Sequence, residues 1–369
     1  MATHPGSFGP KGFPSGARRG RACAAGAARA GLWYARGVAI PLVHYRSPSE
    51  DSGLWLGFRF RPGDIVISTR RKTGTTWMQM ICALLIFQTP ELPDTLRQLS
   101  PWLDNMELPP EIVYAQLGEQ RHRRFIKTHT PLDGIPLHPH VTYIVTARHP
   151  LDAFVSLSHH NEIIGPPPDA GPPPVRHPAG QPGPPGQPGP PGPPPPGLRP
   201  PAPPRPPRPP AAPQSPEMLH DALLRWIAAD DDPRRHPDSL PGVMWHLSDA
   251  WGRRGEPNVL LVHYDDLLAD LEGQMRWLAG RLGIAVAEQA WPALIQAATF
   301  ERMRGRADGL VPTPRGLLED AASFFPRGTS GAGREILGDE EMAGYYARAA
   351  QLAPPDMLEW LHSPAGRTG

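Results

Sequence analysis

The segment that most limits how this chain can fold is residues 64–87, where a short β-branched run leads through a basic, glycine-containing loop into an apolar stretch. The run "DIVIST" has the length and composition of a buried strand. The stretch "WMQMICALLIF" is shorter than the roughly 18 residues that a membrane helix needs, so we expect a core helix. This order predicts the first strand–loop–helix unit of an α/β protein.

Three further runs, at 124–129, 142–147 and 258–264, are also short and rich in β-branched or aliphatic residues. They hardly alternate between apolar and polar positions, which indicates strands buried on both faces of a parallel sheet. Helical patterns lie between and after them: Pro150 suits a first helical position, and a leucine stripe ends at Gly283. The predicted fold class is α/β, with a doubly wound parallel sheet that binds ligands at the carboxyl ends of its strands.

A proline-rich segment interrupts this pattern at residues 166–216, where 27 of 51 residues are proline. Proline has no N–H and cannot join a sheet ladder, so we expect a disordered, extended insert within a single domain of residues 43–361. Five Gly-X-Y triplets at 180–194 are too few for a collagen helix. Two interpretations stay open: a tolerated surface insertion, or a ligand for a proline-binding domain.

Charge and cysteine content narrow the class of protein. The net charge is +1, so no overall field favours nucleic acid or an anionic membrane. The two cysteines form no disulfide pattern and no secretory signal is apparent, so a cytoplasmic location is predicted. Residues 1–42 are basic and rich in glycine and alanine, and we expect them to be disordered, as we do residues 362–369. The composition of residues 1–42 also allows a transit peptide.

The loop "KTGTTW" (72–77) has the features of an anion site. A short loop between a strand and a helix points several N–H groups at one place, and the helix dipole favours negative charge there. Gly74 allows close approach of the backbone, and Lys72 adds a cation. Because the lysine precedes the glycine, the loop is not a Walker A motif. The alternative is a basic turn that caps a buried helix.

The longer stretch "ISTRRKTGTTW" (67–77) resembles the 5′-phosphosulfate loop of the cytosolic sulfotransferase family, which uses 3′-phosphoadenosine 5′-phosphosulfate (PAPS). Three more stretches resemble motifs of that family in the same order: "RFIKTHTPLDG" (124–134), "YIVTARHPLDAFVS" (143–156) and "FFPRGTSGAGR" (324–334). The resemblance is strongest to bacterial glycolipid sulfotransferases. It implies a P-loop-like three-layer fold, with a central parallel sheet flanked by helices.

The resemblance also implies what individual residues do. His129 would be the general base, Lys72 would stabilise the bridging oxygen of the leaving group, and Lys127 would assist at the sulfuryl group. The implied residues of the PAPS site are Lys72, Thr73, Gly74, Thr75, Thr76, Trp77, Arg148, Ser156, Tyr264, Phe300, Arg327 and Gly328. No metal is required, and the His159–His160 pair has no metal-ligand spacing and is expected to be structural.

Within that site, Arg148 and Ser156 would bind the 3′-phosphate, the group that distinguishes PAPS from ATP. Trp77 and Phe300 would lie on opposite sides of the adenine, with Tyr264 nearby. The implied acceptor is a hydroxyl of a hydrophobic or glycolipid molecule, whose pocket such folds build from variable loops.

The sequence departs from the family pattern in several places. Pro326 stands where the family has an arginine, and Ala332-Gly333 replaces Asp-Trp. Arg70 and Arg71 replace the usual Tyr-Pro before the loop lysine. A lost charge-assisted hydrogen bond predicts PAPS binding weakened by about 1.5–3 kcal/mol, or about ten- to a hundredfold. Two other functions are therefore kept: a PAPS-fold scaffold without catalysis, and a P-loop nucleotide kinase.

Overall fold

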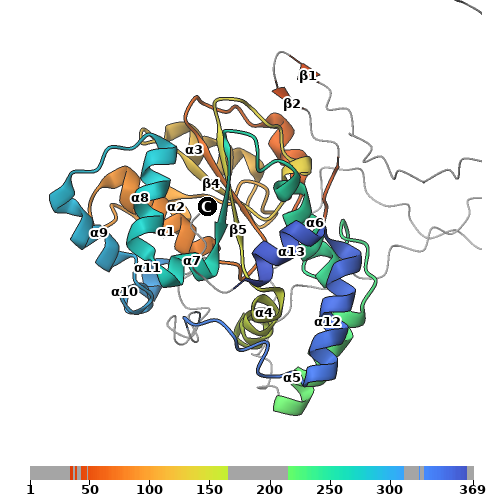
Figure 1. The fold of residues 1–369 in the computed structure, drawn as a ribbon. Helices are drawn as coiled ribbons and strands as arrows, with labels where there is room; N and C mark the ends of the chain where they lie inside the picture. Colours follow the sequence, from red (N-terminus) through yellow and green to blue (C-terminus); the bar gives the residue numbers. More distant parts are fainter. Residues whose placement is uncertain are drawn as a thin grey trace, which may run out of the picture.

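The computed structural model describes residues 34–35, 38–39, 43–47, 49–164, 215–310, 324 and 328–363. In this part of the chain, a parallel four-stranded sheet has the order β4-β3-β5-β6 (Figure 1). Its strands are β3 (Ile65–Thr69), β4 (Phe125–Thr128), β5 (Thr142–Ala147) and β6 (Val259–His263). The four runs expected to be strands are all in this sheet, so the prediction of a parallel α/β sheet is confirmed. A separate antiparallel pair joins β1 (Tyr34–Ala35) and β2 (Val38–Ala39).

Helices cover both faces of the sheet, which gives three layers (Figure 1). Side chains alternate along β3: Ile65 and Ile67 enter one apolar core and Val66 enters the other. The first core packs against α1 (Thr75–Phe87), α2 (Leu96–Leu99), α7 (Tyr264–Ala269), α8 (Leu271–Leu282), α9 (Trp291–Ala297), α10 (Phe300–Arg304) and α11 (Ala307–Leu310). The second packs against α3 (Pro110–Glu119), α4 (Pro150–Ile164), α5 (Pro216–Ala228), α6 (Leu240–Gly252), α12 (Asp339–Leu352) and α13 (Pro355–His362). Burial of β3 on both faces explains why its sequence does not alternate.

Helix boundaries follow the expected signals. Helix α4 begins at Pro150, and α8 ends at Gly283, whose φ of 65° is left-handed. Short 3₁₀ turns complete the fold at η1 (Ser52–Gly57), η2 (Leu132–Gly134) and η3 (Glu288–Ala290). Among the described residues, no helix has the length and apolar character to cross a membrane.

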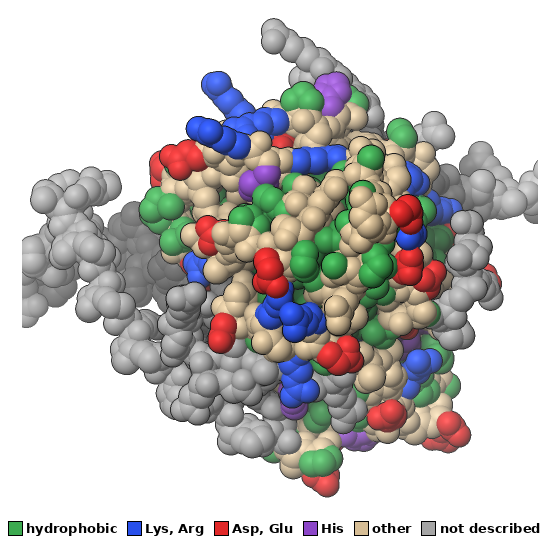
Figure 2. Space-filling model, turned by 90° about the vertical axis from the view of Figure 1, so that its left-hand side faces the viewer, with side chains coloured by type: hydrophobic (Ala, Val, Ile, Leu, Met, Phe, Trp, Pro, Cys, Tyr) green, Lys and Arg blue, Asp and Glu red, His purple; other side chains and the backbone are tan. Residues whose placement is uncertain are grey.

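The predicted proline-rich insert at 166–216 lies almost wholly outside the described residues, as do most of 1–42 and of 362–369. The two helices that flank the insert return to one place, because Phe154 of α4 packs against Trp226 of α5 with ring centroids 5.0 Å apart. On the face shown in Figure 2, seen from the side of α9 and α10, acidic and basic side chains are interspersed. This surface agrees with the net charge of +1 and shows no single-sign field.

Candidate functional site

The candidate site lies at the carboxyl ends of three neighbouring strands. Residues 70–74 follow β3, His129 follows β4 and Arg148 follows β5. Since β3 lies between β4 and β5, its loop has the histidine on one side and the arginine on the other. The fold therefore brings together residues that are far apart in the sequence, at the edge where doubly wound sheets bind ligands.

The loop after β3 has the backbone of an anion cradle. Lys72 and Gly74 are left-handed, with φ of 65° and 107°. A Cβ on Gly74 would lie 3.1 Å from Cδ2 of Tyr264, so the loop is tightly packed there. Helix α1 begins at Thr75 without a side-chain cap, so its first-turn N–H groups lack a capping oxygen. Such N–H groups, together with the helix dipole, suit a phosphate.

The threonine hydroxyls brace this loop. Thr73 Oγ1 donates to the Arg70 carbonyl at 2.8 Å, and the hydroxyls of Thr75 and Thr69 are 2.5 Å apart. These side chains hold the shape of the loop, so binding of an anion rests on its backbone and on Lys72. For Thr76, which follows in the first turn of α1, the hydroxyl makes no contact of this kind in the described part of the chain.

Lys72 is enclosed by an aromatic ring and other cations. Its Nζ lies 4.1 Å from the centroid of the Phe324 ring. Burial, followed by the charges of Arg148 and Lys127, lowers the pKa of Lys72 to about 7. A lysine in this state gains charge when an anion arrives, which suits a group that must stabilise developing negative charge.

His129 is buried and fixed in one tautomer. Its Nδ1 lies 2.5 Å from the Thr69 carbonyl, which can only accept, so Nδ1 carries the proton and Nε2 keeps its lone pair. Burial, followed by the charges of Lys127, Arg70 and Arg71, holds the pKa of His129 well below its ordinary value. The imidazole is therefore neutral at physiological pH, which a general base requires.

Trp102 joins His129 to Lys127. Its ring is 4.7 Å from the imidazole, edge to face, and Lys127 Nζ lies 4.2 Å from the centroid of the same indole. Burial, then the charge of Arg71, lowers the pKa of Lys127 to about 8. The sequence analysis did not single out Trp102 in "SPWLDN". Its backbone forms a parallel bridge with Lys127 of β4, and this contact between distant segments is visible only in the fold.

Arg148 lies on the other side of the loop. Its guanidinium donates to the Lys72 carbonyl at 3.3 Å and to the Thr329 carbonyl at 3.0 Å, and stacks 4.4 Å from the Tyr264 ring. Its buried Nε has no hydrogen-bond partner among the described residues, which leaves a donor for an anion. Ser156 is buried on α4, two turns after Arg148.

Helix α4 also comes near the loop lysine, through His160. His160 lies one turn further along α4, and its ring is 5.4 Å from Phe324, the ring under Lys72. Burial, followed by the charge of Lys72, lowers the pKa of His160 to about 3. Sequence reasoning gave His160 only a structural part, and its position beside Lys72 was not foreseen.

The residues expected around the adenine fall into two neighbouring pairs, Trp77 with Tyr264 and Phe300 with Gly328. Trp77 Nε1 donates to the Ala298 carbonyl at 2.8 Å, and its ring is 5.2 Å from Tyr264. Gly328 has a φ of 69°, and a Cβ there would lie 2.4 Å from Cγ of Phe300, so only glycine fits. Arg327 lies outside the described residues.

Asp152 fixes the loop after Gly328. Its two carboxylate oxygens accept from the Gly331 and Gly333 N–H groups at 2.9 and 2.8 Å. A Cβ on Gly333 would lie 2.4 Å from the Leu151 backbone, so Gly333 suits this close approach. The loop keeps this anchor despite the Ala332-Gly333 departure, and it carries the Thr329 carbonyl that holds Arg148.

A pocket adjoins the Lys127 and Trp102 side of the site. Its empty volume is about 570 Å³, open solvent included. The lining mixes apolar and polar side chains: Gln79, Leu96, Arg97, Ser100, Pro101, Trp102, Asn105, Glu107, Leu108, Val113, Gln116, Lys127 and Leu310. Across the described ranges, no three His, Cys, Asp or Glu side chains are grouped so that they could hold a metal ion.

The loop between β3 and α1 lies uncapped at the carboxyl edge of a parallel sheet, with His129 on one side and Arg148 on the other. This arrangement is typical of α/β proteins that bind anionic ligands at the ends of their strands. The chain belongs to the sulfotransferase family, since the family model described as "Sulfotransferase domain" matches residues 62–345. It is a sulfotransferase enzyme, and the resemblance to bacterial glycolipid sulfotransferases is confirmed.

One relative and two solved structures illustrate the similarity. The glycolipid sulfotransferase of Mycobacterium bovis (strain BCG / Pasteur 1173P2) is 38% identical over 355 residues, which cover 89% of this chain and 95% of that protein. Retinol dehydratase, solved with androsterone and inactive cofactor PAP, has a TM-score of 0.55 at 19% identity, covering 82% of this chain and 86% of that one. Mouse sulfotransferase SULT7A1, complexed with PAP, has a TM-score of 0.53 at 18% identity, covering 81% and 88%. These two likenesses show the fold, and the P-loop-like three-layer prediction is confirmed.

Proposed function

We propose that the protein transfers the sulfuryl group of PAPS to a hydroxyl of a lipid-like acceptor, with His129 as general base. The observation that carries this proposal is the contact between His129 Nδ1 and the Thr69 carbonyl, which leaves Nε2 unprotonated near Lys127, a lysine whose pKa is lowered. A neutral, oriented imidazole next to cations is what proton removal from a hydroxyl and charge stabilisation both need.

The site residues fit PAPS. The uncapped first turn of α1 and Lys72 suit the 5′-phosphosulfate, and the partly free Arg148 with Ser156 suits the 3′-phosphate. Trp77, Tyr264 and Phe300 supply aromatic surface for the adenine. Two solved structures that share this fold contain PAP, the desulfated form of PAPS.

When bound, PAPS would supply the sulfuryl group and the leaving group. His129 would accept the acceptor's hydroxyl proton at Nε2 while its Nδ1–H stays on the Thr69 carbonyl. Lys72 would place its charge at the bridging oxygen, where negative charge grows. Lys127, held over Trp102, would stabilise the transferring group. No covalent enzyme intermediate is needed, because the work is positioning and electrostatic stabilisation.

For the acceptor, we propose an amphiphilic molecule such as a glycolipid. The relative at 38% identity is named a glycolipid sulfotransferase. The pocket beside Lys127 offers both Leu96, Leu108 and Val113 for an alkyl chain and polar groups for sugar hydroxyls. Turnover of a panel of glycolipids against simple phenols and steroids tests this choice: a preference for the phenols or steroids would contradict it.

Calorimetry with PAP, ADP and AMP tests the nucleotide. We expect PAP to bind more tightly than ADP and AMP, because these two lack the 3′-phosphate that Arg148 recognises. Arg148→Met should cost PAP about 1.5–3 kcal/mol, or about ten- to a hundredfold, and leave ADP and AMP little changed. The matched control is Arg254→Met, which removes an exposed arginine paired with Asp356. Equal affinity for the three nucleotides in the native protein would contradict the proposal.

The lowered pKa of Lys72 predicts a pH-dependent affinity for PAP. In the free protein Lys72 loses its proton as the pH rises through about 7, while a bound anion raises its pKa and restores the charge. Binding should therefore take up a proton, and affinity should fall above pH 7 by up to about tenfold per pH unit. Calorimetry in buffers of different ionisation enthalpy measures the uptake. Affinity independent of pH between 6.5 and 9 would contradict this assignment.

A further inference from the structure

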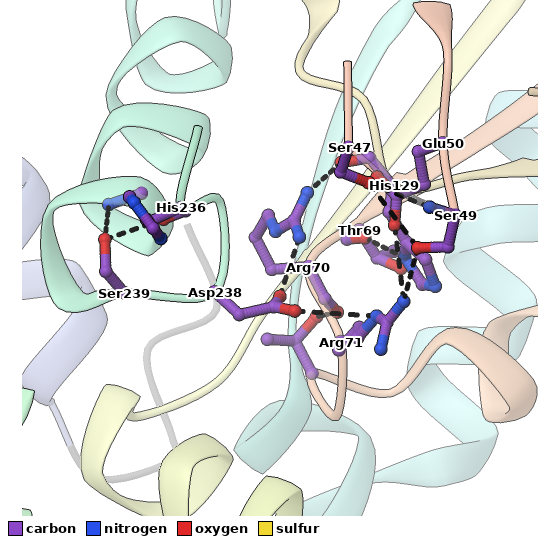
Figure 3. Close-up of polar contacts among 12 residues, drawn as sticks. Ser47, Ser49, Glu50, Thr69, Arg70, Arg71, His129, His236, Asp238 and Ser239 are labelled. Carbon is purple, nitrogen blue, oxygen red and sulfur yellow. Dashed lines mark hydrogen bonds and ion pairs between the residues drawn. The ribbon is translucent and has the colours of Figure 1, made fainter. Parts of the chain in front are cut away.

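Arg70 connects three segments that meet at His129 (Figure 3). One guanidinium nitrogen donates to the His129 carbonyl, and another donates to Asp238 Oδ1 at 2.6 Å. The Arg70 side chain is only 2% exposed. Thr69, the residue before it, accepts from the His129 ring. His129 is thus held by two successive residues, at its ring through Thr69 and at its backbone through Arg70.

Asp238 reaches this point from beyond the proline-rich segment. It lies 168 residues after Arg70, directly before the cap residue of α6, Ser239. Its backbone carbonyl accepts from Trp226 Nε1 at 2.9 Å, so α5 and α6 both fix its position. Burial alone would raise the pKa of Asp238, but Arg70 and Arg71 lower it on balance. The carboxylate is therefore charged wherever the enzyme works, and it compensates a buried cation.

Arg71 completes the cluster on the other side. Its guanidinium lies 3.5 Å from the second oxygen of Asp238 and 3.6 Å from Glu50, and donates to Ser49 at 3.2 Å. Figure 3 shows Asp238 between the two arginines. The cluster joins the segment before η1, the loop before α6 and the loop that carries Lys72.

We propose that the Arg70–Asp238 pair is a positioning device that fixes His129 and the start of the Lys72 loop for sulfuryl transfer. This inference rests on the proposed role of His129 as base. The buried Arg70 guanidinium donates to the backbone carbonyl of His129, directly after β4, and the Asp238 carboxylate fixes the position of the guanidinium. Neither residue contacts the reacting groups, so both act through His129.

The same cluster sets the electrostatic surroundings of His129. The cations facing it are Lys127, Arg70 and Arg71. Asp238 compensates both arginines, and Glu50, whose pKa is raised by burial, lies 3.6 Å from Arg71. Asp104 is buried beside the backbone that carries His129, and it accepts from the hydroxyls of the two flanking residues, Thr128 and Thr130, at 2.5 and 2.6 Å. Loss of Arg70 removes a cation and should raise the pKa of His129. Loss of Asp238 leaves both arginines uncompensated and should lower the pKa of His129 further.

Two single variants and one double variant test the proposal. Both Arg70→Met and Asp238→Asn should lower kcat about ten- to a hundredfold, because the histidine is displaced from its working position. The acid limb of the pH profile should move to higher pH in Arg70→Met and to lower pH in Asp238→Asn. The pKa of His129, read from the ¹⁵N chemical shifts of its ring across pH, should move in the same direction as the acid limb in each variant. Calorimetry should find PAP affinity within a few-fold of native, which separates positioning from loss of the nucleotide site.

Either single change leaves a buried charge without its partner and could destabilise the fold. The double variant Arg70→Met/Asp238→Leu removes both charges, so it separates loss of positioning from loss of stability. It should melt at a higher temperature than the singles and yet keep the low kcat, since the donor to the His129 carbonyl is still missing. Asp356→Asn, which breaks the exposed pair with Arg254, is the control and should leave kcat and the pH profile unchanged. Native kcat and a native His129 titration in the double variant would overturn the inference alone. Turnover by His129→Ala would instead overturn the proposed base.

Discussion

His129→Ala should lower kcat by about 10²- to 10⁴-fold while leaving PAP affinity within a few-fold of the native value. In the proposed mechanism the imidazole removes a proton from the acceptor, because it is neutral and its Nδ1–H on the Thr69 carbonyl leaves the lone pair on Nε2. Steady-state kinetics with saturating PAPS, together with calorimetry on PAP, measure the two effects separately.

The matched control is His220→Ala, on α5, where the histidine pairs with Glu341 at 3.0 Å, away from the sheet edge. It should turn over at the native rate. A His129→Ala enzyme with native kcat would remove the proposed base, and a non-catalytic scaffold of the same fold would become the better description. Loss of PAP binding along with turnover would indicate that His129 supports the site's shape instead of the proton transfer.

The fold could be predicted because its signals are local. Four short runs without alternation mark strands buried on both faces, and the glycine loop between β3 and α1 marks the first crossover. Pro150 and Gly283 mark a helix start and a helix end, because proline and glycine have backbone preferences that no neighbour overrides. Strand order depends on contacts between distant segments and could not be obtained in this way.

The site was predictable where a residue's chemistry is visible in its own motif. Lys72, His129 and Arg148 each follow a strand, and parallel strands bring their carboxyl ends to one edge. Asp238 and Asp152 were missed because each is an ordinary carboxylate, and its partner is more than 160 residues away in sequence. What these two aspartates do becomes visible only when the folded chain places them against buried donors.

The arginines before Lys72 illustrate the same limit. In the sequence, Arg70 and Arg71 stand out only as departures from the family pattern. In the structure Asp238 pairs with both arginines, and Arg71 also lies 3.6 Å from Glu50, so acids from two other segments face the two added charges on the loop. Such compensation is expected for buried charges, which are costly without partners. The departure therefore does not by itself indicate a damaged loop.

Lys72→Met should lower kcat about 10²- to 10³-fold, the usual cost of removing a preorganised group from the site of developing charge. The variant should also lose the proton uptake on PAP binding, because the group with the pKa of about 7 is gone. Lys72→Arg is the informative companion: it keeps the charge, but its larger planar guanidinium must fit over the Phe324 ring and near the charge of Arg148, so partial turnover is expected. Calorimetry in two buffers and kinetics across pH 6–9 give both readouts. Native turnover by Lys72→Met would show that the loop holds the nucleotide without assisting departure of its leaving group, and persistent proton uptake would assign the titrating group to Lys127 instead.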